Sequence, residues 1–100
     1  MSKIAIRIPR HVRMSLDELP EYRDAVTATL NAFAERPHEA WPKESVNGFA
    51  PPEGIDMMRV PPDLLVFIRR DAAGDLNVLQ IMFEEEYLRM RALAKAEALG

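Results

Sequence analysis

MMRVPPDLLVFIRRDAAGDLNVLQIMF, from Met57 to Phe83, is the segment that decides the fold. Its middle, LLVFI at positions 64–68, is apolar at every position. Because successive side chains of a strand point to opposite faces of the sheet, both faces of this segment require cover. The segment therefore predicts the central strand of an antiparallel sheet.

Two further strands are expected beside the central one. Residues 76–83 follow the pentapeptide DAAGD at positions 71–75, and a short connection that contains glycine is typical of a hairpin. Residues 55–60 precede the central strand, with PPD at positions 61–63 as the turn. Regular alternation in the strand at 76–83 predicts two sets of side chains on opposite faces: Leu76, Val78 and Gln80, and Leu79, Ile81 and Phe83.

The N-terminal residues 3–8 alternate isoleucine with other residues, which predicts a half-buried first strand. Pro9 has no backbone N–H to donate, so this strand is expected to end there or to lie at a sheet edge. Arg10, His11 and Arg13 form a small basic cluster behind it. We interpret this cluster as a solvated exit from the strand, because most surface charge runs are solvated.

Two helical segments are expected between the first strand and the strands of residues 55–83. Ser15 and Glu18 have the spacing of a capping box, which predicts that a helical turn begins at Ser15. Pro20 either breaks this turn or stands in the first turn of the next helix, where a missing N–H costs nothing. Apolar residues then recur at helical spacing and predict an amphipathic helix that packs on the sheet and ends at Arg36: Tyr22, Val26, Leu30 and Phe33.

Residues 37–54 hold four of the eight prolines and two of the four glycines, which predicts a loop. Trp41 and Phe49 are its large aromatic residues, and we expect them to pin the loop to the core. Residues 84–99 are rich in helix formers, with acids first and bases later, as the helix dipole favours. This terminal helix is expected either to pack on its own sheet or to dock a partner.

Length and composition fit one domain over residues 1–100. Hydrophobic residues make up 48% of the chain, which is enough for one core. The absence of cysteine excludes a disulfide framework, a thiol nucleophile and a cysteine-ligated metal, and it agrees with a reducing compartment. No segment has the length and apolar character of a signal peptide core or a membrane span. A soluble cytoplasmic protein is therefore expected.

The charge distribution lowers the expectation of nucleic-acid binding without excluding it. The net charge is −3, and the excess of acid lies in residues 51–100, which hold six Lys or Arg and nine Asp or Glu. Proteins that grip phosphates usually carry a basic surface. The two histidines, His11 and His38, lack metal-ligand spacing, and the chain has no glycine-rich phosphate loop or serine nucleophile motif. No metal and no cofactor are expected.

Six residues in the second half are candidates for a functional site. Arg59 and Arg69 lie on neighbouring predicted strands, and two guanidinium groups on one face would suit a phosphate. Tyr87 follows the last strand, and Arg70, Arg89 and Arg91 are candidates for contacts with nucleic acid. The alternative is that the arginines form surface salt bridges with nearby acids, which are Asp56, Asp63, Asp71 and Glu84 to Glu86.

The order of the elements and two segments, DELPEYRDAVTATLNAFAERP at 17–37 and GIDMMRVPPDLLVFIRRDAAGDLNVLQI at 54–81, resemble the RelE/ParE superfamily of bacterial toxin–antitoxin toxins. The resemblance covers residues 16–90 and is carried by an arginine on a strand at Arg59, the DAAG turn and the apolar run NVLQI. It implies an α+β fold, in which an N-terminal helical region packs on an antiparallel sheet of about four strands and a C-terminal helix follows.

The resemblance implies a toxin that inhibits growth, of the kind that stabilises plasmids. RelE-like toxins cleave mRNA on the ribosome. By position the resemblance assigns to catalysis Arg59 as the strand arginine, Arg69 or else Arg70 as the second cation, and Tyr87 as the late aromatic residue. ParE-like toxins inhibit DNA gyrase and need no catalytic residues. The implied partners are a cognate antitoxin, the ribosome with mRNA or DNA gyrase, and a second copy of the chain; no membrane partner is expected.

Two departures from the family pattern leave a second function open. Leu65 stands where the family has a strand arginine, and Glu84 to Glu86 stand where a basic segment is usual. Three carboxylates beside a scissile phosphate would repel it and oppose efficient RNA cleavage, so enzymatic activity is left undecided. The alternative is a non-catalytic protein of the toxin fold that acts as a protein-interaction module.

Overall fold

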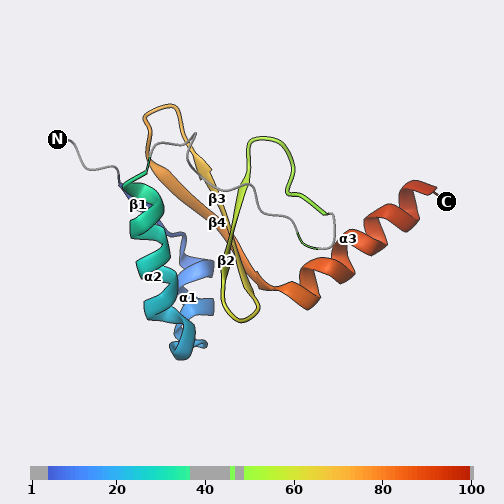
Figure 1. The fold of residues 1–100 in the computed structure, drawn as a ribbon, viewed down its shortest axis with the longest axis horizontal. Coiled ribbons are helices and arrows are strands. Elements are labelled where there is room, and N and C mark those ends of the chain that lie inside the picture. Colours follow the sequence, from blue (N-terminus) through green and yellow to red (C-terminus); the bar gives the residue numbers. More distant parts are fainter. Residues whose placement is uncertain (1–4, 37–45, 47–48, 100) are drawn as a thin grey trace.

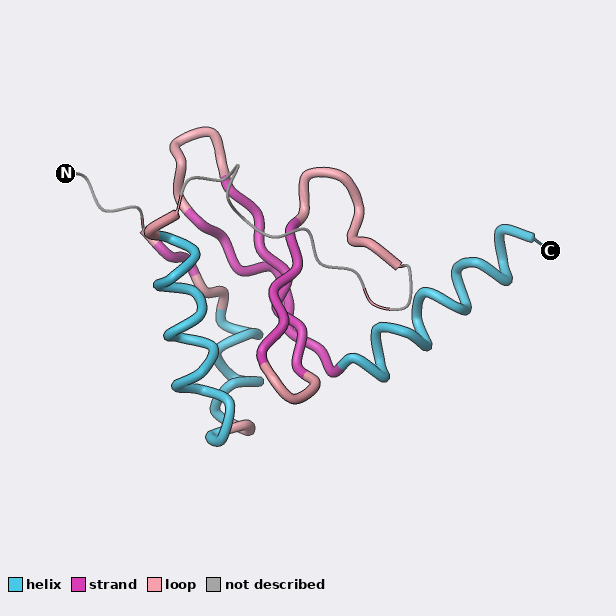
Figure 2. Tube along the Cα trace, viewed as in Figure 1, coloured by secondary structure: helices cyan, strands magenta, loops and turns pink. Residues whose placement is uncertain are grey.

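The computed structural model describes residues 5–36, 46 and 49–99, and it confirms the predicted α+β class (Figure 1). Two helices lie side by side next to the sheet, and the third projects away from its other end (Figure 2). In chain order the elements are β1 (Ile6–Arg7), α1 (Arg10–Asp17), α2 (Pro20–Ala34), β2 (Asp56–Val60), β3 (Leu64–Arg70), β4 (Leu76–Phe83) and α3 (Glu84–Leu99).

The four strands form one sheet in the order β1-β4-β3-β2. As predicted, β3 is central and runs antiparallel to both neighbours. The sheet is not wholly antiparallel, however, because β1 pairs with β4 in the parallel sense. The two strands are far apart in sequence, so no tight turn forces them to run in opposite directions. The Leu76 N–H donates to the Ala5 carbonyl at 2.9 Å beside this pair.

Both faces of β3 are buried, which confirms the reading of LLVFI. Leu64, Val66 and Ile68 face α1 and α2, and none of the three is exposed. We call this side of the sheet the helix-covered face. Leu65 and Phe67 point the other way and pack with Met57, Val46 and Tyr87 on what we call the opposite face.

A β-bulge in β4 overturns the predicted alternation of that strand. Phe67 is paired with Gln80 and Ile68 with Val78, so Leu79 is an extra residue without a partner on β3. The extra residue shifts the alternation by one position. Ile81 and Phe83 therefore lie on the helix-covered face with Leu76 and Val78, whereas the regular pattern had placed them on the opposite face.

The prediction that a helical turn begins at Ser15 is wrong, because α1 begins at Arg10 and ends at Asp17. The Ser15 hydroxyl donates to the His11 carbonyl at 3.0 Å inside the helix. Burial of Val12 and Leu16, which lie four residues apart on one side of α1, outweighs the local capping signal. The basic cluster of Arg10, His11 and Arg13 is consequently helical, and its three residues are exposed, as expected for a solvated cluster.

The amphipathic helix at residues 20–34 is confirmed. Pro20 is its first residue, and Val26, Leu30 and Phe33 are buried against the sheet. At its beginning, the Tyr22 hydroxyl donates to the Asp63 carboxylate at 2.6 Å, and this hydrogen bond raises the pKa of Tyr22. The contact holds α2 to the β2–β3 turn.

α3 starts at Glu84, directly after β4, and extends away from the sheet (Figures 1 and 2). Its first turns pack through Tyr87 and Leu88, while Met90 and Leu93 are 49% and 59% exposed. Phe49 packs beside Tyr87, as expected for a loop anchor; Trp41 and Lys3 lie outside the described residues. None of the helices that the structure describes could cross a bilayer.

Candidate functional site

Arg59, the first candidate for catalysis, forms an ion pair with an acid. Its guanidinium lies 3.4 Å from the carboxylate of Glu84, and both side chains are partly exposed. The pair joins β2 to the beginning of α3. This is the salt bridge that the alternative interpretation of the arginines predicts.

Arg59 and Arg69 share the opposite face, but the Arg59 guanidinium is directed at Glu84 and not at Arg69. Arg59 is paired with Leu65, and Arg69 lies four residues further along β3, which places the two backbones about 13 Å apart. Arg59 also reaches away from Arg69, toward Glu84. Arg70 is paired with Leu76 and so lies on the helix-covered face. The three arginines therefore do not converge.

Tyr87 is a core residue of the opposite face. It is 1% exposed, and its ring lies 5.3 Å from the ring of Phe67 in a tilted arrangement. Its hydroxyl donates to the Phe49 carbonyl at 3.2 Å. The tyrosine fastens residue 49 of the long connection to the base of α3, and its hydroxyl is turned away from solvent.

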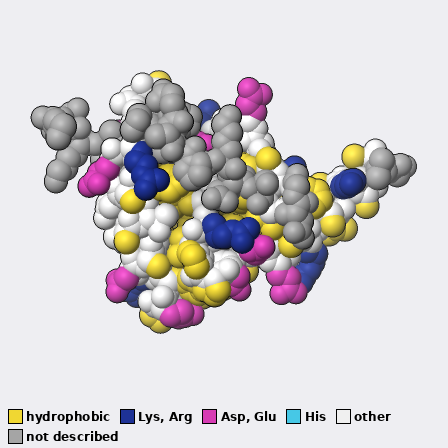
Figure 3. Space-filling view, in the orientation of Figure 1, with side chains coloured by type: hydrophobic (Ala, Val, Ile, Leu, Met, Phe, Trp, Pro, Cys, Tyr) yellow, Lys and Arg dark blue, Asp and Glu magenta, His cyan; other side chains and the backbone are white. Residues whose placement is uncertain are grey.

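The two remaining arginines lie on α3. Arg89 forms an exposed ion pair with Glu85 at 3.4 Å, one helical turn away. The Arg91 guanidinium stands over the Phe49 ring, 5.7 Å from its centroid, as in a cation–π contact. On the face drawn in Figure 3, the basic side chains stand apart from one another, with acids and apolar groups between them. On this face the visible basic side chains form no continuous patch.

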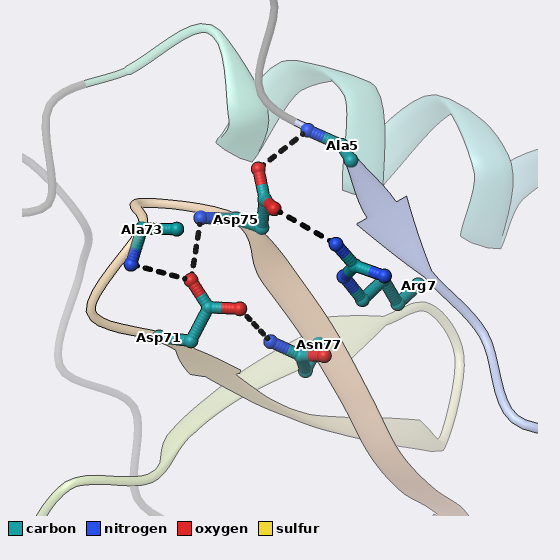
Figure 4. Close-up of polar contacts among 6 residues, drawn as sticks. All are labelled: Ala5, Arg7, Asp71, Ala73, Asp75 and Asn77. Atoms are coloured by element: carbon teal, nitrogen blue, oxygen red, sulfur yellow. Dashed lines mark hydrogen bonds and ion pairs between the residues drawn. The ribbon is translucent and has the colours of Figure 1, made fainter.

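A polar network at the β3–β4 hairpin was not foreseen from the sequence (Figure 4). The Asp71 carboxylate accepts hydrogen bonds from the Asn77 side chain at 3.0 Å and from the amides of Asp75 and Ala73 at 2.9 and 3.0 Å. These bonds, that from Asn77 above all, lower the pKa of Asp71. The network fixes the hairpin, in which Gly74 has a φ of +88°.

The neighbouring carboxylate ties β1 to the sheet. The Asp75 carboxylate accepts a hydrogen bond from the Ala5 amide at 3.0 Å and forms an ion pair with Arg7 at 3.2 Å (Figure 4). Its role is structural, because every partner belongs to the two strand ends that it joins. No local signal in the sequence reveals this contact, because Arg7 and Asp75 are 68 positions apart and meet only through the pairing of β1 with β4.

The outer edge of β4 is the feature of the structure that most needs a functional explanation. Strand pairing on this side stops at Asn77, so within the described residues no strand covers positions 78–83. Two side chains form hydrogen bonds with backbone groups of this edge. A ring nitrogen of His11 lies 3.0 Å from the Leu79 carbonyl, and the Ile81 N–H donates to the Gln80 side chain at 3.2 Å.

An open cleft of about 400 Å³ lies at the upper end of this edge, where the chain after β1 leaves the sheet. Ile8, Pro9 and His11 line one side, and Val78 and Leu79 line the other. Among the described residues, no three His, Asp or Glu side chains come together as a metal site requires. The cleft therefore adjoins the uncovered edge, between the chain that leaves β1 and the bulged part of β4.

Comparisons with family models, with curated proteins and with solved structures each find no match for this chain.

Proposed function

We propose that this chain is a non-catalytic protein of the toxin fold that acts by binding another protein. One observation carries the proposal: the Tyr87 hydroxyl, assigned by the resemblance to RNA cleavage, is buried and donates to the Phe49 carbonyl. A group that acts on a scissile phosphate must reach it within hydrogen-bond distance. This hydroxyl serves the core instead.

The charges around the candidate residues support binding over RNA cleavage. Electrostatic catalysis at a phosphate needs fixed cations aimed at the developing negative charge. Here the Arg59 guanidinium faces Glu84, and Glu85 and Glu86 follow within the same turn of α3. A phosphate placed beside Arg59 would meet the carboxylate of Glu84.

α3 offers a surface for protein binding. Most of its length lies beyond the sheet, and an isolated helix of 16 residues is only marginally stable in water without tertiary contacts. Met90 and Leu93 are exposed on it. A partner that covers these side chains would stabilise the helix. For a toxin that works by contact, this partner would be its cellular target or its antitoxin.

Controlled expression of the full chain in bacteria tests the proposal. We expect growth to stop on induction, by contact with a cellular protein such as a gyrase-type target. Arg59→Ala with Arg69→Ala should still arrest growth, because neither arginine is needed for binding. Met90→Asp with Leu93→Asp should restore growth, because two charges would be buried on binding without partners.

Two results would contradict the proposal. Codon-phased cuts in cellular mRNA, seen by primer extension and abolished by the double arginine variant, would show catalysis. Unimpeded growth, with soluble protein confirmed by blotting and by far-UV circular dichroism of the purified chain, would remove the toxin role. The double arginine variant is the matched control for the helix variant, since both change two exposed positions.

A further inference from the structure

We propose that the open edge of β4 pairs with the same edge of a second copy of this chain, antiparallel and centred on Ile81. The two sheets would then join through their β4 strands into one continuous sheet of eight strands. The inference concerns self-association and is independent of whether the chain arrests growth. It is argued from the direction of the backbone groups, the length of the edge and its charges.

The backbone of β4 presents the groups that such a pairing needs. In a strand, the N–H and C=O groups of successive residues point alternately to the two sides. The Glu84 N–H donates to the Asp63 carbonyl at 2.8 Å, on the β3 side. The backbone N–H and C=O groups of Ile81 and Phe83, which lie an odd number of residues from Glu84, therefore point away from β3, toward the open edge. The use of the Gln80 side chain by the Ile81 N–H agrees with this direction.

The groups that now occupy the edge are easily displaced. Gln80 is exposed, so its side chain is free to turn toward water when another backbone carbonyl takes its place. The His11 ring is likewise on an exposed residue. Natural sheets protect edges with such side chains or by pairing them. In the proposed dimer, Ile81 exchanges hydrogen bonds with Ile81 of the other copy, and the Leu79 carbonyl accepts from Phe83.

The bounds of the edge favour a symmetric pair. β1 covers β4 up to Asn77, and α3 begins at Glu84, so the uncovered stretch is about 20 Å long. With Ile81 on the two-fold axis, the end of β4 in one copy lies opposite the place where β1 departs in the other. The cleft beside Ile8 and Val78 gives room there for the beginning of the second α3.

The charge pattern of α1 is complementary to itself. α1 lies on the β4 side of the helix-covered face, next to α2 (Figure 1). It has no acid in its first turn and no base in its last, the reverse of what the helix dipole favours. An antiparallel pair sets the basic beginning of one α1 opposite the acidic end of the other. His11 of one copy then faces Glu18 of the other, with Met14, 58% exposed, between them.

Sedimentation equilibrium of the full chain tests the inference first. We expect a concentration-dependent dimer between about 1 µM and 1 mM. His11→Glu and Glu18→Lys should each weaken the dimer about tenfold, and the double variant should restore it, because the two changes recreate the pair in reversed form. Arg13→Glu is the matched control: it reverses a charge on the same helix, on the side away from the β4 edge, and should leave the dimer intact.

A nitroxide on Gln80→Cys tests the register. The chain has no cysteine, so the label is unique. In the proposed pairing Gln80 lies opposite Met82, so the two labelled positions are diagonal neighbours about 7 Å apart, and strong dipolar broadening is expected. Circular dichroism of each variant confirms folding. Three results would overturn the inference: a monomer at all concentrations, a dimer without dipolar broadening, or a double variant that dimerises no better than the single variants. It would also be overturned if the β4 edge bound an added extended peptide while the chain stayed monomeric.

Discussion

The two faces of the sheet are covered in different ways. On the helix-covered face, α1 and α2 bury thirteen residues in one cluster that reaches all four strands or their immediate neighbours. On the opposite face, the described residues bury five, and Tyr87 joins the beginning of α3 to the segment at Phe49. The first face is made of regular elements that hold one another in place, whereas the second depends on single anchors. We infer that, among the described residues, those of the helix-covered face contribute more to stability than those of the opposite face.

The sharpest test of this difference uses two adjacent leucines on β3. Leu64 and Leu65 are both fully buried and point to opposite faces. We expect Leu64→Ala to lower the free energy of unfolding by about 4 kcal/mol and Leu65→Ala by about 2.5 kcal/mol. The difference is expected because the two packed helices above Leu64 relax into a cavity less readily than the cover of the opposite face above Leu65. Urea unfolding measures both values. Equal losses, or a larger loss at Leu65, would break the comparison.

A somewhat smaller effect is expected at the main anchor of the opposite face. Tyr87→Ala should lower the free energy of unfolding by about 3 kcal/mol, because it removes a ring that packs on Phe67. Tyr87→Phe keeps the ring and loses the hydrogen bond to the Phe49 carbonyl, for about 1 kcal/mol. Denaturation of the two variants separates ring from hydroxyl. Should Tyr87→Phe cost as much as Tyr87→Ala, the hydroxyl and not the ring would be the anchor.

The Asp71 network lies at the end of the sheet and belongs to neither face. It predicts that the stability of the protein depends on pH. Hydrogen bonds lower the pKa of Asp71 in the folded chain below its ordinary value. Its contribution to stability is therefore present above the unfolded pKa of about 3.9 and is lost as the pH falls through the folded pKa. Thermal melting between pH 2 and 6 should show this loss in the parent chain and less of it in Asp71→Asn. An unchanged acid slope in the variant would assign the dependence to other carboxylates.

The smallest effect is expected for the ion pair between Arg59 and Glu84. Both side chains are partly exposed, so Arg59→Ala should change the free energy of unfolding by about 0.5 kcal/mol or less. The difference should shrink further at 1 M salt, where exposed charges are screened. Arg69→Ala is a suitable control on the same face. A loss above about 2 kcal/mol would show that this ion pair is an anchor of the opposite face comparable to Tyr87.

Much of the fold was readable from local patterns. Consecutive apolar residues at 64–68 predicted a strand buried on both sides, and DAAGD predicted the hairpin in which Gly74 adopts a positive φ. The bulge at Leu79 was not readable, because an extra residue is visible only against its partner strand. The start of α1 was misplaced because the capping pattern at Ser15 is local, whereas burial of Val12 and Leu16 is decided by the sheet.

The candidate site was less accessible to sequence reasoning. Whether Arg59 and Arg69 converge depends on strand register, and whether Arg59 is engaged depends on where Glu84 falls after the bulge. The burial of Tyr87 depends on its contact with Phe49, thirty-eight positions away. Among the residues that the structure describes, the open edge of β4 is a property of the whole sheet, since it depends on how far the short β1 runs along β4.

The direct junction of β4 and α3 has a mechanical consequence. No loop separates Phe83 from Glu84, so a rotation of the last strand residues also turns the helix that follows. A rod of 16 residues is about 24 Å long, and a turn of about 10° at its base moves its tip by about 4 Å. A small rotation at the end of β4 is thereby converted into a larger displacement at the far end of α3.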